Sequence, residues 1–330
     1  YSDLVQYYHG TSSVRLDSLS QAEADSLIQS RLSAWDVVLA TDNKYKGSGE
    51  IDGNNDYDLR YAVKHAVNGD AIVIDYNVLG ENDYYTKEIY IGAELEVNRN
   101  VSIYGISGFY EDENIVIRVV ATGTDPLTGE PVIIGDNPGS MYRVFNITGG
   151  NVYLDNLTVL GGHVIAVSDD AIGGGTIAVG GTETQNVYFR DLVIANGWSD
   201  KGGNLWYDNT AENSSLTLDN VTIFYGFAGS YDSDLEVAIA DGIGGNAYLN
   251  GTVTINGGAI YGSVGIDTAG TAGAVYAGPN TVLTINGTDI SDTTARNDGG
   301  AVYLASGAAM TLRNGSVFGT MAYGNGGAVY

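Results

Sequence analysis

Paired acidic side chains are the first candidates for chemistry in this chain. Asp169 and Asp170 are adjacent in the segment Ser168-Asp169-Asp170-Ala171-Ile172. Inverting hydrolysis of a glycosidic bond uses two carboxyl groups about 6.5–9.5 Å apart, one as general acid and one as general base. The segment therefore makes Asp169 and Asp170 the candidate catalytic residues of a polysaccharide-cleaving enzyme.

Residues that would complete such a site do not accompany the two aspartates. No Asn-Thr-Asp, Gly-His-Gly or Arg-x-Lys sequence follows them, and His163 is the only histidine beyond residue 65. A lyase would also need Arg or Lys to hold a uronate. The basic residues beyond residue 143 are few and widely spaced: Arg190, Lys201, Arg296 and Arg313. We therefore expect Asp169 and Asp170 to be solvated corner residues in a protein without catalytic activity, with a polysaccharide hydrolase or lyase as the alternative.

Oxygen side chains near the N-terminus could bind calcium. Asp52, Asn54 and Asp56 alternate along the chain, as the first ligands of an EF-hand loop do. Tyr57 and Val63 stand where that loop requires glycine and glutamate. The sequence therefore leaves two interpretations, a Ca²⁺ site or a polar loop before the next helix.

A second acidic group lies far along the chain. Asp232 and Asp234, followed by Glu236, would be further Ca²⁺ ligands. The formal net charge of the chain is −26, and bound cations would relieve that repulsion. A solvated loop without metal is the alternative interpretation.

Aromatic residues occupy equivalent positions in a repeated phrase, and they are the candidate binding residues. If the apolar residues on either side of each aromatic point inward, the aromatic itself points outward. The residues concerned are Trp206, Tyr248, Tyr276, Tyr303 and Tyr330. Such a column could contact sugar rings or a partner protein, or its members could stack on each other and stiffen the sheet.

The elements that position these residues follow from the repeat. Two glycines, a small residue, an apolar residue and usually an aromatic recur, and the second glycines are 28, 42, 28, 27 and 27 residues apart from Gly175 onward. The long step is one repeat with an insertion of 14 residues, which we place within Ser230 to Ile243. A fixed period of this length indicates a solenoid.

Between the glycine pairs, apolar residues alternate as in short strands. In the segment from Leu216 to Ile223, the residues expected to face inward are Leu216, Leu218, Val221 and Ile223, and those expected outside are Thr217 and Thr222. One repeat then holds about three strands and three corners, which is one coil of a parallel β-helix. With coils ~4.8 Å apart, roughly ten coils after residue 70 would form a rod ~45–50 Å long.

Asparagine recurs near the corners of this repeat. The sequence Asn-x-Ser/Thr occurs at Asn100, Asn146, Asn156, Asn213, Asn220, Asn250, Asn286 and Asn314. Turn formation explains this placement, because asparagine tolerates left-handed backbone angles. Stacked corners could also align the asparagines into side-chain ladders.

The segment before the repeat has a different pattern. Ser20 and Glu23 form a capping box for a helix over about residues 21–34, and residues 35–39 are expected to form a strand. A second helix is expected within residues 58–69, directly before the first strands. Because the first coil of a solenoid exposes its interior and its strand edges, we expect this second helix to cap it.

Composition excludes several classes of protein. The acidic balance argues against nucleic acid and against an anionic membrane surface as partners. The absence of cysteine excludes disulfides and cysteine-bound metals, and no apolar run reaches the roughly 18 residues of a membrane-spanning helix. Residues 121–141, which hold three of the four prolines, are expected to form a protruding loop.

The start of the repeat carries a family resemblance. Many secreted bacterial and archaeal right-handed β-helix proteins open with a segment of the form Leu-Arg-Glu-Ala-Ile … Gly-Asp-Thr-Ile. This chain resembles them in Leu59-Arg60-Tyr61-Ala62-Val63 and, downstream, in Gly69-Asp70-Ala71-Ile72. Tyr61 replaces the usual glutamate. The Gly-Gly-Ala-Val repeats are similar to those of polymorphic outer-membrane adhesins and autotransporter passengers. The segment around Asp169 resembles the paired-aspartate segment of polygalacturonases. The resemblance covers about residues 58–330 and implies a pectate-lyase-like fold in a secreted or cell-surface setting; the fold itself hosts adhesins, lyases, hydrolases and tail spikes.

These observations predict an all-β protein: a right-handed parallel β-helix with about 27–28 residues per coil. Residues 1–57 would form a non-repeat segment with one helix, residues 58–69 the cap, and residues 70–330 the β-helix, which we expect to continue beyond Tyr330. The expected function is a secreted or cell-surface adhesin or structural rod of a bacterium or archaeon. Its partners would be a host-cell, matrix or glycan surface, or copies of itself, as in a filament or a viral tail spike.

Overall fold

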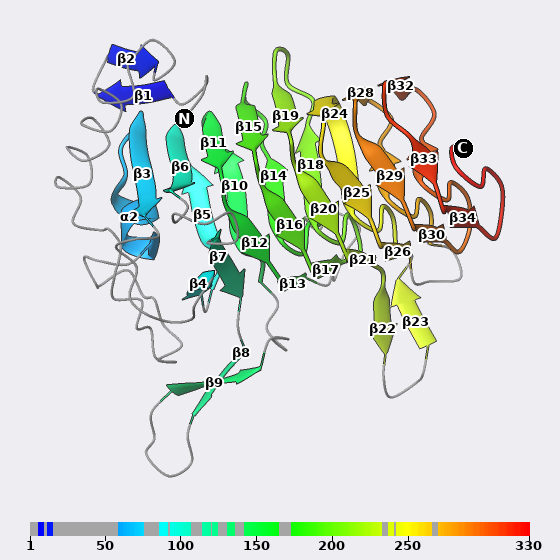
Figure 1. The fold of residues 1–330 in the computed structure, drawn as a ribbon, viewed down its shortest axis with the longest axis horizontal. Helices are drawn as coiled ribbons and strands as arrows, with labels where there is room; N and C mark the ends of the chain where they lie inside the picture. Colours follow the sequence, from blue (N-terminus) through cyan, green and yellow to red (C-terminus); the bar gives the residue numbers. More distant parts are fainter. Residues whose placement is uncertain are drawn as a thin grey trace.

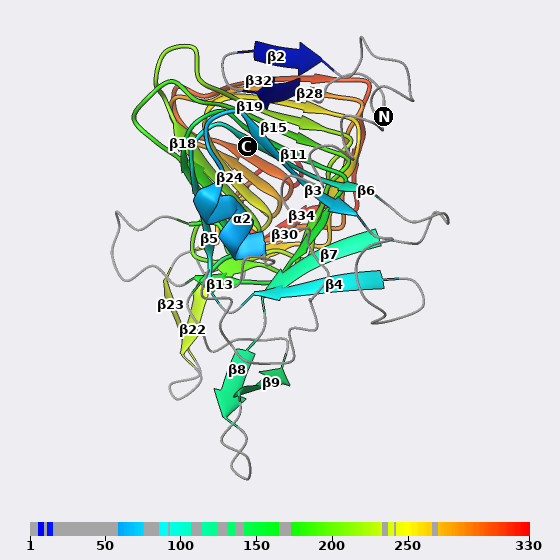
Figure 2. The same cartoon turned by 90° about the vertical axis from the view of Figure 1, so that its left-hand side faces the viewer.

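The computed structural model describes residues 6–9, 12–15, 59–75, 86–91, 93–106, 114–119, 121–124, 131–135, 142–164, 173–232, 237–240, 242–265 and 270–330. Parallel strands stacked coil upon coil form a rod from α2 to the C-terminal strands (Figure 1). Seen from the N-terminal end, the chain turns clockwise as it recedes, so the β-helix is right-handed (Figure 2). The predicted fold class is confirmed.

Each coil has four sides, which we call faces 1 to 4 in chain order. Face 1 consists of β5 (Leu95–Asn98), β10 (Phe145–Gly149), β14 (Ile177–Gly180), β18 (Leu205–Asn209), the first part of β24 (Ala247–Asn256), β27 (Val275–Ala277) and β31 (Val302–Leu304). Face 2 consists of β3 (Asp70–Asp75), β6 (Val101–Ile106), β11 (Val152–Asp155), β15 (Asn186–Arg190), β19 (Ser215–Asp219), the second part of β24, β28 (Val282–Asn286) and β32 (Ala309–Arg313).

Faces 3 and 4 complete the coil. Face 3 consists of β4 (Thr86–Ile91), β7 (Asn114–Val119), β12 (Thr158–Leu160), β16 (Val193–Ala195), β20 (Thr222–Phe224), β25 (Ala259–Tyr261), β29 (Asp289–Ser291) and β33 (Val317–Phe318). Face 4 consists of the two-residue strands β13 (His163–Val164), β17 (Trp198–Ser199), β21 (Phe227–Ala228), β26 (Val264–Gly265), β30 (Thr294–Ala295) and β34 (Met321–Ala322). The expectation of three strands per coil therefore missed face 4, whose strands are too short to show an alternating pattern.

The number of coils is also smaller than expected. Within the described residues, face 3 is an eight-stranded sheet. Eight strands ~4.8 Å apart span about 34 Å between the outermost strands, shorter than the expected rod. The estimate of ten coils was wrong because it assigned residues to coils that lie in insertions between strands.

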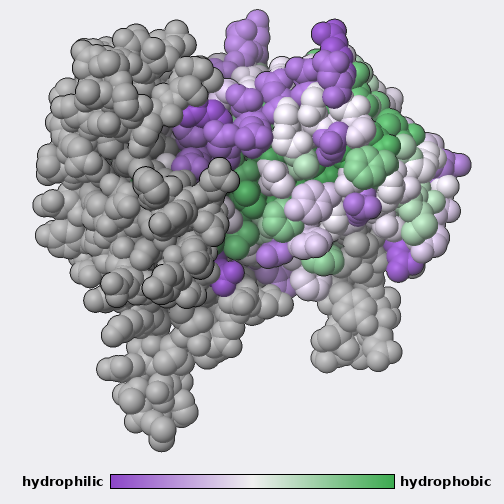
Figure 3. Space-filling view, in the orientation of Figure 1, coloured by the Kyte–Doolittle hydropathy of each residue, from purple (hydrophilic) through white to green (hydrophobic). Residues whose placement is uncertain are grey.

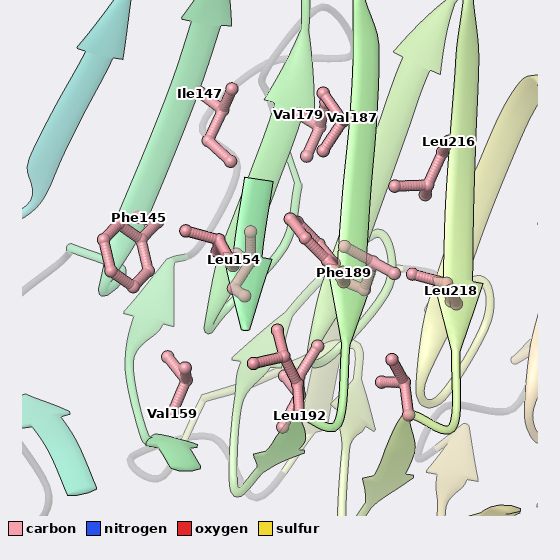
Figure 4. Close-up of a cluster of buried hydrophobic side chains, with 14 of the residues drawn as sticks. Phe145, Ile147, Leu154, Val159, Val179, Val187, Phe189, Leu192, Leu216 and Leu218 are labelled. Atoms are coloured by element: carbon pink, nitrogen blue, oxygen red, sulfur yellow. The ribbon is translucent and has the colours of Figure 1, made fainter. Parts of the chain in front are cut away.

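The interior is a continuous stack of aliphatic side chains. Leu216, Leu218, Val221 and Ile223 are at most 1% exposed, as their alternation predicted. Side chains from successive coils fill the same interior, with Phe145 and Phe189 among the larger ones (Figure 4). Full burial of one such side chain stabilises the fold by about 1.5–3 kcal/mol. The register between neighbouring coils is fixed because a slip of one residue would turn the apolar side chains of a whole strand outward.

The predicted cap is present as α2 (Leu59–His65). Its buried residues Leu59, Ala62 and Val63 belong to the same hydrophobic cluster as the coils, and the Arg60 guanidinium donates hydrogen bonds to the carbonyls of Ala93 and Glu94 beside β5. The helix is shorter than the expected range. It ends before the turn in which Gly69 has φ 95° and Asp70 accepts a hydrogen bond from the backbone N–H of Val67.

Two antiparallel hairpins project from the same side of the rod (Figures 1 and 2). β22 (Ser230–Asp232) pairs with β23 (Val237–Ala240), so the predicted insertion is a hairpin between faces 4 and 1. β8 (Ala121–Thr124) pairs with β9 (Pro131–Gly135) inside the predicted protrusion. A third hairpin, β1 (Gln6–His9) with β2 (Ser12–Arg15), was not expected, and the helix predicted over residues 21–34 and the strand over 35–39 lie outside the described residues.

Corner residues behave as turn chemistry predicts. Asn156, Asn220 and Asn314 occupy the corner between faces 2 and 3 with φ of 52°, 53° and 55°. Asn314 Nδ2 donates to Oδ1 of Asn286 at 3.1 Å across adjacent coils, so at least one pair of corner asparagines forms the expected side-chain link. The corners thus add polar cross-links outside the apolar interior.

Candidate binding surfaces

The aromatic column predicted from the sequence lies on face 1. The register pairs Trp206 with Tyr248, Tyr248 with Tyr276, and Tyr276 with Tyr303. Ring centroids in these pairs are 6.5, 5.4 and 5.2 Å apart, and Tyr303 and Tyr330 are again 5.2 Å apart. The interplanar angles lie between 6° and 23°. The five rings form one stacked row, here called the face 1 ladder.

Stacking decides which part of each ring is accessible. Parallel strands place equivalent side chains ~4.8 Å apart, close to the spacing at which aromatic rings contact each other. Tyr276 has one neighbour on each ring face, so its two faces are covered and its edge is what the ladder presents. The alternative of a self-stacking column therefore describes the geometry. The binding role of the column stays a prediction, and it concerns ring edges and hydroxyl groups.

Trp206, at the start of the ladder, was expected to be exposed but is buried. It is 9% exposed. Its register partner in the preceding coil is Ala178, which has no ring to stack on. The indole lies instead over Gly180 of that coil, where an added Cβ would be 2.6 Å from Cζ3 of Trp206. Trp206 is buried because the small residues Ala178 and Gly180 on the preceding strand leave a surface that the indole covers.

The hydroxyl groups of Tyr248 and Tyr276 stay protonated over the physiological pH range. Burial, followed by the charge of Asp208 and the neighbouring Tyr276, raises the pKa of Tyr248 to about 12. Burial and the neighbouring Tyr303 also raise the pKa of Tyr276. Neutral phenols both donate and accept hydrogen bonds, so the face 1 ladder presents a row of such groups along the rod.

A polar network on face 2 was not expected. Arg190 Nε donates to Asp155 Oδ1 at 3.1 Å, while a second bond joins its Nη2 to the other carboxylate oxygen at 2.5 Å. Tyr153 and Tyr188 stack 5.2 Å apart beside this pair, and the Arg190 guanidinium lies 5.9 Å from the centre of the Tyr153 ring. Burial raises the pKa of Asp155, although Arg190 opposes that shift. The network ties three coils together, since Tyr188 also donates to Asp219 at 2.7 Å.

A second aromatic group was also missed. Phe224 and Tyr261 stack on face 3, and Tyr225 and Phe227 follow at the corner with face 4. Aligning the phrase Val221-Thr222-Ile223 with Gly258-Ala259-Ile260 would have placed Phe224 and Tyr261 together. One side of the rod shows hydrophobic residues exposed among hydrophilic ones (Figure 3). The surface is therefore not uniformly polar.

The predicted catalytic and metal residues are not placed by the structure. Asp169 and Asp170 lie outside the described residues, as do Asp52, Asn54, Asp56 and Asp234, and for Asp232 only the backbone in β22 is described. Among the side chains that are described, no three of His, Asp or Glu gather closely enough to hold a metal ion. The catalytic alternative and the Ca²⁺ sites therefore stay predictions.

Comparison with models of protein families, with curated proteins and with solved structures found no match. In the part of the chain that the structure describes, no helix is both long enough and apolar enough to span a bilayer. The architecture of a parallel β-helix is thus established by the fold itself, and function has to be argued from its surfaces.

Proposed function

We propose that this protein is a secreted or cell-surface rod that binds a glycan or protein surface along its β-helix without catalysing a reaction. The observation that carries this proposal is the face 1 ladder, an unbroken row of stacked rings from Trp206 to Tyr330. Stacking fixes the rings before any partner arrives, so binding costs little side-chain entropy. Tyrosine also combines apolar contact area with a polar tip, which suits a surface that is wet when free.

The resemblance of the cap segment and of the glycine-rich repeats supports the extracellular setting and membership of the pectate-lyase-like β-helix proteins, which we include in the proposal. The acidic charge supports a partner that is not polyanionic. The mostly buried ion pair between Arg190 and Asp155 links two coils, which accords with a structural rod.

The test is incubation of the protein with a panel of polysaccharides, with chain cleavage and retained binding measured in the same samples. The double variant Tyr276→Ser/Tyr303→Ser removes two central rings and should weaken retention about tenfold or more, equivalent to at least 1.4 kcal/mol. The matched control is Thr284→Ser/Thr311→Ser, which changes outward positions at the same coils of face 2 and should bind as the wild type does.

Circular dichroism and thermal melting establish whether each variant remains folded. Unchanged binding in a folded Tyr276→Ser/Tyr303→Ser protein would contradict the role of the ladder. Cleavage of a polysaccharide that disappears in Asp169→Asn would replace the proposal by the alternative of a polysaccharide-active enzyme.

A further inference from the structure

The corner between faces 3 and 4 is built from left-handed residues on successive coils. Positive φ is found there at Asn196, Tyr225, Gly262, Asp292 and Gly319. Glycine, asparagine and aspartate adopt this conformation readily. A bulky aromatic residue with φ of 50° is a genuine outlier. Backbone strain of this kind persists only where the surrounding structure holds it in place, and it clusters at functional sites.

The Tyr225 ring is oriented differently from the rings of the face 1 ladder. The rings of Phe224 and Tyr261 stack with their centroids 5.0 Å apart and an interplanar angle of 2°. A group beside this stack therefore meets the edges of the two rings. Tyr225 stands at 78° to Phe224 with centroids 5.1 Å apart, and at 77° to Tyr261. Such an edge-to-face contact uses one face of the Tyr225 ring. Tyr225 remains 51% exposed, so we infer that its other face is open.

Neighbouring residues hold this ring in place. One side of the Tyr225 ring lies against Gly262, where an added Cβ would be 2.7 Å from Cε1. A side chain at position 262 would displace the Tyr225 ring, but the next coil has glycine at this position. Tyr225 is therefore an exposed aromatic face that is already fixed in orientation before binding.

The aromatic surface continues round the corner onto face 4. Phe227 is 37% exposed, and its ring lies 6.4 Å from that of Trp198. The Trp198 indole N–H donates to the carbonyl of Gly229, which fixes the indole, and His163 stacks on its other side at 4.6 Å. We call Phe224, Tyr225, Phe227 and Tyr261 the corner aromatic cluster.

We propose that the corner aromatic cluster is a binding site for a neutral polysaccharide, with one pyranose ring stacked on the open face of Tyr225. The C–H bonds on one side of a pyranose ring are weakly positive and match the negative face of an aromatic ring. The net charge of −26 disfavours polyuronates and other polyanions at the same surface. The site is separate from the face 1 ladder, so the two binding tests can fail independently.

The test measures binding of neutral hexasaccharides of glucose, mannose and galactose, with hexagalacturonate as the anionic counterpart, by calorimetry at millimolar ligand. The wild type should bind at least one neutral hexasaccharide and not hexagalacturonate. Tyr225→Asn introduces the residue that the preceding coil uses at this corner, Asn196, and should lower affinity about tenfold or more. Tyr225→Phe keeps the ring and should retain binding.

Two controls make the result specific. Tyr323→Asn removes an even more exposed tyrosine, at 63%, from the last coil that the structure describes, and this variant should bind as the wild type does. Thermal melting should show Tyr225→Asn folded, because asparagine accepts the left-handed angles better than tyrosine. Absence of binding to every neutral hexasaccharide, or full affinity in a folded Tyr225→Asn protein, would overturn the proposal, as would equal binding of hexagalacturonate.

Discussion

Asn204 donates a hydrogen bond from Nδ2 to Oδ1 of Asn246, one coil further along, at 2.8 Å. Both side chains are fully buried at the corner between faces 4 and 1. Asn204 Oδ1 accepts the backbone N–H of Gly197 at 2.7 Å, and Asn246 Oδ1 accepts that of Gly226 at 3.0 Å. The two amides thereby satisfy backbone groups that would otherwise be buried without partners.

Later coils fill the same corner with other residues, whose side chains bond a different backbone group. Ala274 and Ala301 take the place of the asparagines, and a hydroxyl residue takes the place of the glycine. Ser263 Oγ donates to the Gly273 carbonyl and Thr293 Oγ1 to that of Gly300, both at 2.6 Å. The corner therefore uses either asparagine with glycine or alanine with a hydroxyl residue.

This exchange predicts a compensating pair of substitutions. Asn246→Ala leaves the Gly226 N–H buried without its acceptor and should cost about 1–3 kcal/mol of unfolding free energy. Gly226→Ser alone should also destabilise, because its Cβ would lie 2.3 Å from the Gly245 carbonyl oxygen and 2.7 Å from Asn246 Oδ1. The double variant recreates the side-chain pattern of the later corner and removes the contact between the new Cβ and Asn246 Oδ1, so it should lose less stability than the sum of the two single losses. Urea unfolding of all four proteins measures the coupling, and strictly additive effects would contradict the explanation.

The raised pKa of Tyr248 predicts how the free energy of unfolding changes at alkaline pH. Its pKa of about 12 in the folded protein lies above the value of about 10 in an unfolded chain. Its contribution is fully present below about pH 10 and is lost as pH rises toward 12, because the unfolded chain gives up this proton first. Tyr248→Phe should therefore lose less stability than the wild type between these pH values. Urea midpoints measured across that range check this, and parallel curves would contradict it.

The contact between Gly180 and the Trp206 indole predicts that a larger residue at position 180 would expose Trp206. A Cβ at Gly180 would be 2.6 Å from the indole, so Gly180→Val should push Trp206 off the preceding strand and into solvent. The expected result is a red shift of tryptophan fluorescence and a lower melting temperature. Gly149→Ala on β10 is the control, since its Cβ would meet nothing closer than 3.6 Å. An unchanged emission spectrum in folded Gly180→Val would show that the indole is held elsewhere.

Much of this architecture could be predicted because the repeat carries it. The spacing of Gly203, Gly245 and Gly273 gave the coil length and located the insertion that forms β22 and β23. Alternation at Leu216 and Leu218 gave the inward face. The capping helix followed from its helical spacing and from the need to cover the first coil. These features are local or periodic, so one sequence suffices to predict them.

The sequence by itself determined the β-helix, its period and the alignment of Tyr248, Tyr276 and Tyr303. Only the tertiary structure decided that these rings cover each other's faces and that Trp206 lies on Gly180. It also decided that the Tyr225 ring stands nearly perpendicular to that of Phe224 and stays half exposed. The physical reason is that a period fixes which residues are neighbours between coils, whereas ring orientation depends on backbone angles at the corners and on the volume of the side chains in adjacent coils.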